Sequence, residues 1–586
     1  MKNVLILLSI SCLVFLSACS DDFLSPDPKS FFSPEAVYTD EAGFEALLVT
    51  MRRDLRNDTH GYVNNIAMGY TMSDLAISIE PSDLRNITPS DAPGGWPYLS
   101  FLDEGYEYIK NANVLVSRID DVEWDDQEVR DRLLAEALWH RAYWYYRLVH
   151  TYGDIPWIAE ELQGVKLDFE TYSRTAILEK IQEDLEWAEE RLPIERATNG
   201  DVTQGAVSHL LVKVALANRD YERAIEAADW LIDESGYSLM TDRFGIDSGD
   251  PNRNVQWDLH RGENKNPSQN TETIYVTIDR PDAPTDARTA EGTHSNRLYT
   301  PSYWKILDSE GVRWCNWDSE TGDTLGIGNA NVRTNHFWHY KIWEDDNFTW
   351  EDTPDERRAD INWVEMNEIH GCDPNSPNFE EPFSKDYYGS LIDTFDTWYP
   401  WPQYKTYNES PNSRLPVGGE ADWYLFRLAE TYLLRAEAHY WNNDPGLAMD
   451  DINEVRERAN APLLTSTNDV TIDYIFDERA RELYMEEPRH SEMVRVSFIM
   501  AEEGLSGYSP ETISQDNWYY DRVMRVNNHY QETEPVWRGS IAYIEPHHIL
   551  LPIPDSAIEA NTQGHVNQNE GYAGAGSNQT PIDTIE

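Results

Sequence analysis

Two stretches of the chain share one design, and they restrict the fold more than any other feature. Each has an amphipathic helix, a short polar turn that contains aspartate, and a second helix. The first reads HLLVKVALANRDYERAIEAADWLI from His209, and the second reads WYLFRLAETYLLRAEAHYW, NNDPG and LAMDDINEVRERAN from Trp423. Ala224 and Ala448 stand at matched places in the second helices, where small side chains allow close packing. The pattern predicts helix pairs that pack on one another.

Further segments have helical periodicity. The stretch from Asp125 to Tyr152 has apolar residues three and four apart, acidic residues at its start, and Gly153 and Pro156 after it, which are helix start and stop signals. Helix pairs of this length resemble tetratricopeptide units, which need neighbours to bury their apolar faces. We therefore predict a mainly α fold in which tetratricopeptide-like helix pairs form a scaffold. The other predicted helices are Arg174–Leu192, Thr203–Asn218, Asp220–Glu234 and Ile472–Met485.

The middle of the chain differs from these helical parts. From about Tyr237 to Gly419, proline, glycine and asparagine are frequent and helical periodicity is poor, although Thr273–Ile278 is typical of a strand. Long irregular regions of this kind are uncommon and usually functional. We predict a loop-rich, irregular subdomain packed on the scaffold. The predicted division is an N-terminal helical part over 31–236, a variable ligand-binding subdomain over 237–419, and a C-terminal helical part with an irregular end over 420–586.

The N-terminus has the features of an export signal. An apolar run from Val4 to Leu16 follows Lys2 and ends at Ser17-Ala18-Cys19. The run is too short to span a bilayer, which takes about 20 apolar residues, and it ends in small residues typical of a cleavage site. We expect a signal peptide over 1–18. The acidic, proline-containing tract after it predicts a flexible tether over 19–30.

Charge and cysteine content narrow the classes of partner. The chain has 47 basic and 105 acidic residues, a net charge of −58, so phosphate repulsion makes nucleic acid an unsuitable ligand. No CxxC pair or zinc-type spacing is present. If residues 1–18 are removed and Cys19 is modified, Cys315 and Cys372 remain in an oxidising compartment. They either pair or stay as two separate buried thiols.

Aromatic residues are abundant outside the periodic segments. The chain has 21 Trp and 33 Tyr, and many stand among Asn, Asp, Gly and Pro, as in GGWPY, HFWHY and WYPW. A ring in a loop often serves local packing. A set of such rings also suits sugars, because a pyranose stacks its apolar face on an aromatic ring while polar side chains bind its hydroxyls.

Six sequence blocks, in order along the chain, carry a family resemblance. They are LSAC with DDFL; AEALWHRAYWYYRLVHTYGDIPW; RLAETYLLRAEAHYW; INEVRERAN; ERARELYMEEPRH; and ILLPIPDSAIEANTQGHVNQNEGY. Together they resemble SusD/RagB outer-membrane glycan-binding lipoproteins, and LSAC resembles the bacterial lipobox. The resemblance implies a diacylglycerol on Cys19 and a surface-exposed protein that is anchored by lipid alone. It also implies a SusC-like TonB-dependent transporter as partner.

The resemblance also suggests candidate ligand contacts. Family members have an acidic residue after the first long helix and an aromatic residue on the next loop, which Asp74 and Trp96 match. From the variable middle we add Trp338 and Trp343, which stand in aromatic-rich segments. Arg85 and Arg297 are possible donors to sugar hydroxyls.

The charged residues of these sequence blocks are interpreted as structural. Arg141 is predicted to be a buried cation that needs a carboxylate, and Glu430 or Glu437 is expected to meet either it or Arg479. The charged residues of ERARELYMEEPRH are interpreted as helix-surface and interhelix pairs.

The sequence favours a binding protein over an enzyme. It has no HExxH, no GxSxG and no phosphate-binding glycine loop, and with 105 acids a carboxylate pair carries no information. No cofactor is expected, although the acidic stretch Asp247–Asp258 is a candidate for calcium. The alternatives are a surface protein that binds peptide or another nutrient and, less favoured, a glycan-active enzyme.

Overall fold

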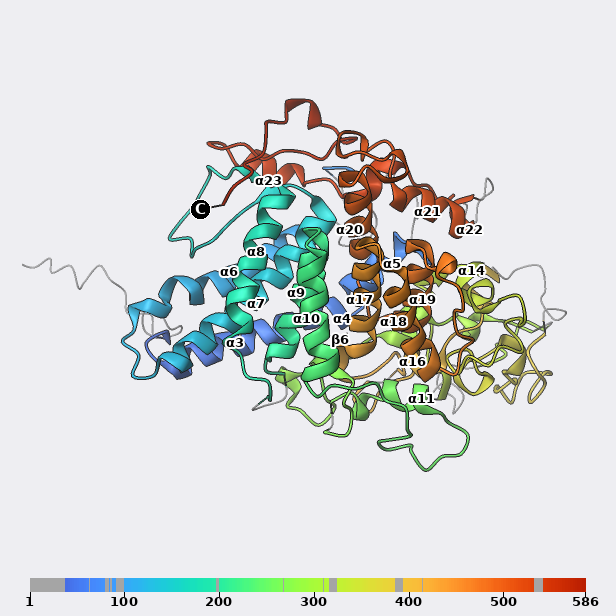
Figure 1. Ribbon diagram of the computed structural model, residues 1–586. Coiled ribbons are helices and arrows are strands. Elements are labelled where there is room, and N and C mark those ends of the chain that lie inside the picture. The colour runs from blue at the N-terminus through green and yellow to red at the C-terminus, as the bar shows by residue number, and fades with distance from the viewer. Residues whose placement is uncertain are drawn as a thin grey trace, which may run out of the picture.

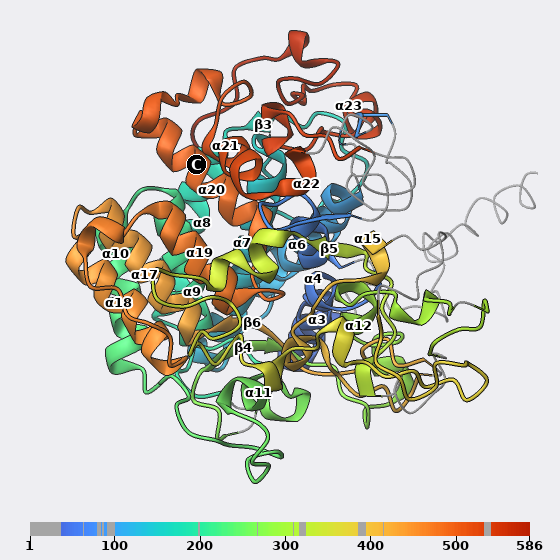
Figure 2. The ribbon, with the colours of Figure 1, turned by 90° about the vertical axis from the view of Figure 1, so that its right-hand side faces the viewer.

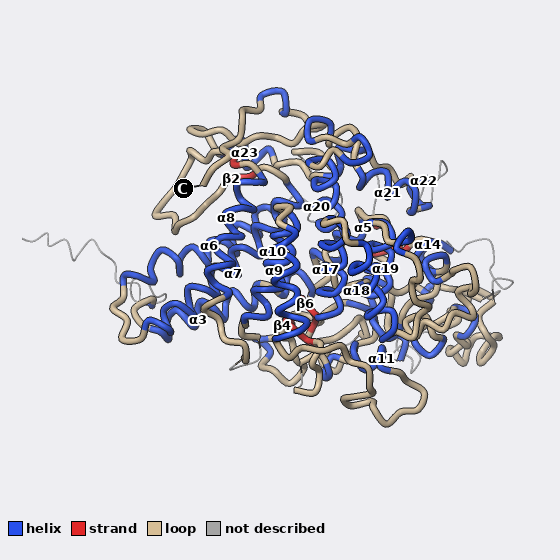
Figure 3. Tube along the Cα trace, viewed as in Figure 1, coloured by secondary structure: helices blue, strands red, loops and turns tan. Residues whose placement is uncertain are grey.

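The computed structural model describes residues 37–62, 64–78, 84, 87–90, 100–196, 200–266, 268–308, 310–315, 324–384, 394–413, 415–531 and 541–585. Long helices stand side by side through the body of the molecule (Figure 1). Loop-rich segments cover one end of this body, and the irregular C-terminal segment covers another (Figure 3). Among the described residues, no helix combines the length and the apolar character needed to cross a membrane.

The scaffold consists of helices longer than eight residues. Its N-terminal members pack in chain order from α6 to α10, and α10 packs against α17, so the two predicted helical parts join directly. These helices are α3 (Glu41–Asp54), α6 (Ser100–Arg118), α7 (Gln127–Tyr152), α8 (Arg174–Glu189), α9 (Gln204–Ala217), α10 (Tyr221–Asp229), α17 (Leu428–Trp441), α18 (Pro445–Arg458), α19 (Ile472–Leu483), α20 (Arg489–Glu502) and α21 (Trp518–Val526). The mainly α fold is confirmed.

Helix α7 is the centre of the scaffold. Every residue from Ala135 to Tyr152 is buried, because the helix is covered by α6, α8 and α20. Asp126 caps its start by accepting a hydrogen bond from the Glu128 amide at 2.9 Å. Gly153 ends it at a φ of 68°, a left-handed conformation that glycine adopts without a steric penalty.

The two predicted helix pairs turn in the same way. Arg219 and Asn443 have positive φ angles of 62° and 61°, and each is followed by an aspartate that caps the next helix. Asp220 accepts a hydrogen bond from the Arg223 amide, and Asp444 accepts one from the Leu447 amide. The shared turn confirms that the two stretches are the same kind of structural unit.

One predicted helix start is wrong. Trp423–Arg427 is not helical but forms strand β6, which pairs antiparallel with β4 (Thr273–Thr277). Aromatic residues are common in strands as well as in buried helices. Here Trp423–Arg427 forms a strand because it pairs with Thr273–Thr277, which is rich in β-branched residues. The other two-stranded ribbons join β1 (Ala76–Ser78) to β5 (Val332–Thr334) and β2 (Ile155–Pro156) to β3 (Thr171–Tyr172).

The described part of 237–419 contains no helix longer than six residues, as the loop-rich prediction requires. Its short helices are α11 (Val255–His260), α12 (Ser295–Tyr299), α14 (His336–His339), α15 (Thr394–Thr397) and α16 (Gln403–Thr406). The remaining short helices elsewhere are α4 (Arg56–Thr59), α5 (Asn65–Thr71), α22 (Asn528–Gln531) and α23 (Asp555–Ala560). Figure 2, in which the right-hand side of Figure 1 faces the viewer, labels α12 and α15.

The charged residues of ERARELYMEEPRH were predicted to form helix-surface and interhelix pairs. They are buried, so the interhelix part of the prediction is confirmed and the helix-surface part is wrong. Arg479 and Glu482 of α19 are 0% and 2% exposed. Arg479 pairs with Glu487 and Glu492, while Glu482 pairs with Arg427 and Arg458. Each buried charge therefore has an opposite charge beside it, as a low-polarity interior requires.

The structure shows which charged residues pair with Arg141, Glu430 and Glu437. Arg141 is buried and pairs with Asp184 at 2.6 Å, not with Glu430 or Glu437. Glu430 does lie 3.6 Å from Arg479, as predicted. Glu437 binds Arg495 through both of its oxygens.

Candidate functional site

Asp74 lies inside the protein rather than at a ligand surface. It is 0% exposed. Arg489 donates to both of its oxygens at 2.9 and 2.7 Å, and Arg522 donates to one of them at 2.7 Å. Burial alone raises the pKa of a carboxyl, but the charges of Arg489 and Arg522 outweigh it and lower the pKa of Asp74 to about 2. The prediction that Asp74 contacts ligand is therefore wrong.

Trp338 and Trp343 are also core residues, at 2% and 4% exposure. The Trp338 indole donates to the Ala480 carbonyl, its ring centroid lies 3.9 Å from that of Tyr484, and the Trp343 indole donates to the Trp338 carbonyl. A sugar needs an accessible ring face for stacking, so the prediction that these two rings bind glycan is wrong. Cys19, Arg85 and Trp96 lie outside the described residues, and their predicted roles stay predictions.

A cavity of about 410 Å³ is lined by Arg522, the ion-pair partner of Asp74, and by Phe337, the chain neighbour of Trp338. We call it the α14–α21 cavity, since helices α14, α19, α21 and α22 supply nine of its ten lining residues. Figure 1 labels these four helices. Its volume is within the range of small-ligand sites. Its lining residues are His336, Phe337, Lys341, Asp473, Asp477, Arg522, Arg525, Val526, Asn528 and Gln531.

Asp74 and Trp338 position residues that line this cavity. Arg522, which Asp74 holds from behind, reaches Asp473 at 2.9 Å and Asp477 at 2.7 Å. Asn335 caps α14 by accepting a hydrogen bond from the Trp338 amide, and its own side-chain amide donates to the Asp74 carbonyl at 2.7 Å. The inward-facing Trp338 thus anchors the single turn of helix that presents Phe337 to the cavity.

The cavity combines an apolar ring with hydrogen-bonding groups. Phe337 is half-buried. The carboxylates of Asp473 and Asp477 keep 40% and 26% exposure while they pair with arginine. Such a combination matches a sugar, whose faces are apolar and whose edges carry hydroxyls. Sequence reasoning chose Trp338 and missed its neighbour Phe337, because the sequence of a single helical turn does not show which of two adjacent rings faces the core.

Arg297 lies at a second aromatic position. Its guanidinium lies 4.3 Å from the ring centroid of Tyr62, a cation–π contact. Tyr62 is 38% exposed and accepts a hydrogen bond from the Asn331 amide at 2.9 Å. The pair forms a polar and aromatic surface that the sequence did not predict, because Tyr62 and Arg297 come from distant parts of the chain.

The acidic stretch Asp247–Asp258 folds around an arginine. Arg243 donates to both carboxylate oxygens of Asp258 and to the carbonyl oxygens of residues 247, 250 and 253. The guanidinium therefore uses the oxygens that a calcium ion would need. Among the described residues, no group of three or more His, Cys, Asp or Glu side chains is arranged to hold a metal ion. Calcium binding at this stretch stays a prediction that requires displacement of Arg243.

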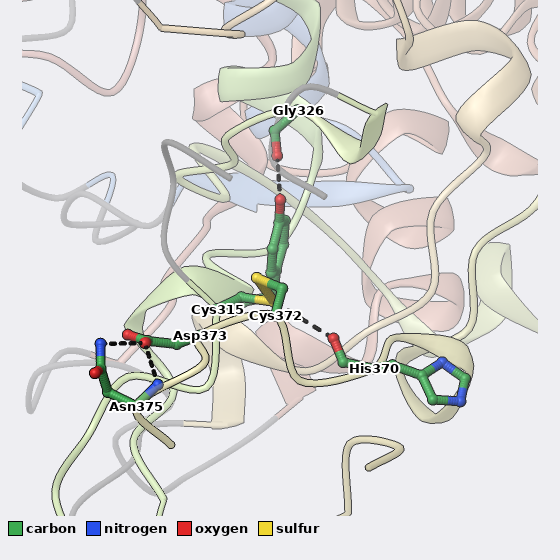
Figure 4. Close-up of a disulfide and its surroundings, with 7 residues drawn as sticks. Cys315, Gly326, His370, Cys372, Asp373 and Asn375 are labelled. Atoms are coloured by element: carbon green, nitrogen blue, oxygen red, sulfur yellow. Dashed lines mark hydrogen bonds between the residues drawn. A yellow bond between two sulfur atoms is a disulfide. The ribbon is translucent and has the colours of Figure 1, made fainter. Parts of the chain in front are cut away.

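The two remaining cysteines form a disulfide. Cys315 and Cys372 are 57 residues apart in the chain, with a Cα–Cα distance of 4.7 Å. Figure 4 shows the bond beside Asp373 and Asn375, whose amide groups donate to the Asp373 carboxylate. The open question of whether these cysteines pair is resolved in favour of a crosslink within the loop-rich region.

The chain belongs to the SusD family, whose model matches residues 253–572, more than half of the chain. A second model, described as "Starch-binding associating with outer membrane", matches residues 44–216. The two matches together extend over both helical parts.

Named relatives agree with this assignment. The chain is 22% identical over 583 residues to the SusD-like protein P25 of Formosa agariphila, an alignment that covers 94% of this chain and 95% of the relative. It is 33% identical over 156 residues to the starch-binding protein SusD of Bacteroides thetaiotaomicron, which covers 26% of this chain and 22% of the relative. These names describe SusD-like and binding proteins, not enzymes.

Solved structures share the fold. The surface glycan-binding protein A of Bacteroides thetaiotaomicron, solved in complex with laminarihexaose, matches with a TM-score of 0.61 at 18% identity, covering 91% of this chain and 99% of that one. A laminarin-binding SusD-like protein matches with a TM-score of 0.60 at 20% identity, covering 91% of this chain and all of that one. At these identities the likeness concerns the fold.

Proposed function

We propose that this protein captures oligo- or polysaccharide at the cell surface and passes it to a SusC-like TonB-dependent transporter in the outer membrane. Membership of the SusD family supports the general role. The names of its relatives, which include starch-, laminarin- and surface glycan-binding proteins, support a carbohydrate ligand.

The observation that carries the proposal is the composition of the α14–α21 cavity. Phe337 provides a ring for stacking, and Asp473, Asp477 and Asn528 provide groups for hydroxyls in the same cavity. The arginines that hold these carboxylates leave the cavity close to charge balance, which suits a neutral sugar. A site with one stacking ring and a few hydrogen bonds binds weakly enough to release its ligand.

Delivery to a transporter requires the protein to stay beside the membrane. A diacylglycerol on Cys19 would anchor it there, since acyl chains contribute about 0.8 kcal/mol per buried CH₂ and two chains hold firmly. Tethering also raises the local concentration of the binding protein at the barrel mouth. In this arrangement the helical body acts as a lid that carries bound glycan to the transporter.

Calorimetry of the mature protein against laminarihexaose, maltohexaose and a wider glycan panel tests the site. Phe337→Ala removes the stacking ring and is expected to weaken binding of the preferred glycan roughly tenfold, the scale of burying one large apolar side chain. Phe379→Ala is the matched control, because Phe379 is 42% exposed and does not line the cavity. Equal affinity of Phe337→Ala and wild type would exclude this cavity.

Two further measurements separate the parts of the proposal. Trp96→Ala tests the predicted contact that lies outside the described residues. Co-purification of the wild-type protein with its transporter from detergent-solubilised outer membranes tests the partnership, with the isolated binding protein as reference. Binding of a peptide library in preference to every glycan would assign the same lid role to a different nutrient.

A further inference from the structure

Tyr62 differs from most aromatic side chains of this protein because it is exposed. Among the Phe, Tyr and Trp side chains of the described residues, only Tyr62 and Phe379 are exposed, at 38% and 42%. A large ring left in water forgoes the free energy that its burial would contribute. An exposed ring that is also held in a fixed position is therefore a candidate for contact with a ligand.

Tyr62 is held in this way. The Asn331 amide donates to its hydroxyl at 2.9 Å, and the Arg297 guanidinium lies 4.3 Å from its ring centroid. The backbone beside it is fixed as well, because the Gly61 amide donates to the Gly292 carbonyl at 3.0 Å. A ligand that stacks on a preorganised ring loses little entropy in ordering it. We call Tyr62 together with Arg297 the Tyr62 platform.

Asn331 has no exposed surface role of its own. It is 2% exposed, and burying an amide is costly unless its groups form hydrogen bonds. Its amide nitrogen forms such a bond with the hydroxyl of Tyr62. A buried polar side chain therefore fixes the direction of an exposed ring.

Arg297 places hydrogen-bond donors next to the ring. Its side chain keeps 31% exposure, and the Glu291 carboxylate lies 4.0 Å from its Nη1, beyond hydrogen-bond distance. Within the described part of the chain this guanidinium makes no hydrogen bond, so its donors are available to a ligand. An accessible ring beside available donors suits a sugar, whose faces are apolar and whose edges carry hydroxyls.

One short strand connects the Tyr62 platform to the α14–α21 cavity. Asn331 directly precedes β5, and Asn335, directly after it, caps the helix that presents Phe337 to the cavity. Asn331 and Phe337 are six residues apart, so even a fully extended chain would separate their Cα atoms by only about 20 Å. An oligosaccharide of several units is long enough to contact both places.

We propose that a glycan chain held in the α14–α21 cavity stacks a further sugar ring on Tyr62, with Arg297 donating to hydroxyls of that ring. This inference rests on the proposed function and extends it, because it makes the protein select longer chains over shorter ones. Two weak contacts on one chain bind more tightly than either alone, since the first raises the local concentration of the chain at the second. Each contact by itself stays weak enough for release.

Calorimetry on the mature protein with oligosaccharides of defined length tests this preference. The probes are laminaritriose and laminarioctaose, together with maltotriose and maltooctaose. Tyr62→Ala is expected to lower the affinity for the octasaccharide that the wild type prefers by about tenfold, the scale of one large apolar contact. It is expected to leave the affinity for the corresponding trisaccharide unchanged, because the trisaccharide occupies the cavity alone.

Three further variants assign the effect to the ring. Tyr62→Phe keeps the ring and removes the hydroxyl, so it is expected to retain most of the affinity for the octasaccharide. Phe379→Ala removes the other exposed ring and is the matched control, with no expected effect. Phe337→Ala is expected to weaken both oligosaccharides, since both occupy the α14–α21 cavity.

The outcomes separate this inference from the proposed function. Wild-type affinity of Tyr62→Ala for the octasaccharide, with weakened binding by Phe337→Ala, would overturn the second contact and leave the proposed function intact. An equal loss for trisaccharide and octasaccharide would also overturn it. Absence of glycan binding by the wild type would contradict the proposed function itself, and this inference with it.

A protein contact is the other use of an exposed ring. If Tyr62→Ala lost co-purification with the transporter while its octasaccharide affinity stayed at the wild-type value, the inference would be overturned. The ring would then belong to the surface that contacts the transporter.

Discussion

At the scale of single residues, the carboxylate of Asp74 joins parts of the chain that are more than 400 positions apart. It binds Arg489 of α20 and Arg522 of α21, and Arg522 also lines the α14–α21 cavity. Two guanidiniums on one buried carboxylate are stable only while that carboxylate keeps its charge. Asp74 is therefore a positioning residue, and its loss affects both the fold and the cavity.

Asp74→Asn is expected to destabilise the protein by about 3 to 5 kcal/mol, the usual cost of breaking a buried ion pair. The pKa of Asp74 is lowered from 3.8 to about 2 in the folded state. Its contribution is therefore present above pH 3.8 and is lost as the pH falls towards 2. Urea unfolding at several pH values measures the difference. Asp125→Asn, an exposed acid, is the control; a similar small effect for both variants would contradict this role.

His490 provides a second pH prediction, at higher pH values than those at which Asp74 titrates. It is 2% exposed, and burial, helped by the charge of Arg147, lowers its pKa from 6.5 to about 4. The unfolded chain therefore takes up this proton first, and stability falls as the pH drops from 6.5 to about 4, by about 1.4 kcal/mol per pH unit for this one residue. His490→Gln is expected to flatten the slope of unfolding free energy against pH by that amount. Parallel slopes for the two proteins would show that the pKa of His490 is the same in the folded and unfolded chains, and would contradict the prediction.

The sequence predicted that buried charged residues need partners of opposite charge, but it did not predict which aromatic side chains are exposed. The need of Arg141 for a carboxylate was predictable, but the choice of Asp184 depends on how α7 and α8 pack. Likewise, HFWHY shows that rings are present without showing that Trp338 faces the core and Phe337 the cavity. Side-chain direction in a one-turn helix has no periodic pattern from which it can be predicted.

At the scale of elements, local signals predicted most of the long helices, and tertiary pairing changed the start of one of them. The helix expected over Asp125–Tyr152 begins two residues later and ends where Gly153 predicted. Trp423–Arg427 became a strand because Thr273–Thr277 pairs with it across about 150 residues. Helices α3, α6, α20 and α21 were not predicted. In α20 the charged residues Arg489, Glu492 and Arg495 are buried in ion pairs, so its buried face is not marked by apolar residues alone.

The disulfide between Cys315 and Cys372 crosslinks two segments of the loop-rich region. Closing a loop of 57 residues restricts the unfolded chain by about 4 kcal/mol in the chain-entropy model. A Cys315→Ala/Cys372→Ala variant is expected to unfold at lower temperature by a corresponding margin. Reducing agent is expected to bring wild type towards the variant and to leave the variant unchanged. An equal effect of reductant on both proteins would show that the crosslink does not stabilise the fold.

At the scale of the whole molecule, the two helical parts and the loop-rich region form one connected structure. Residues 76–78 pair with residues 332–334, and residues 273–277 pair with residues 423–427. Arg427, at the end of the second ribbon, enters the buried ion network through Glu272, Glu482 and Glu486. These contacts cross the predicted boundaries at 236/237 and 419/420. The linear division predicted from composition stays a prediction.

The role of a transporter lid depends on attachment of the whole molecule at Cys19. Cys19→Ala is expected to remove the acyl chains, because the thiol is their attachment point, and to release the protein from the membrane fraction, because those chains are its proposed anchor. Mass spectrometry of the detergent-extracted wild type should show a diacylglycerol-modified N-terminus, and the variant should lack it. Cys12→Ala is the matched control, because Cys12 lies within the predicted signal peptide. Retention of unmodified Cys19→Ala in washed membranes, with undiminished glycan uptake, would contradict lipid anchoring and leave contact with the transporter as the means of attachment.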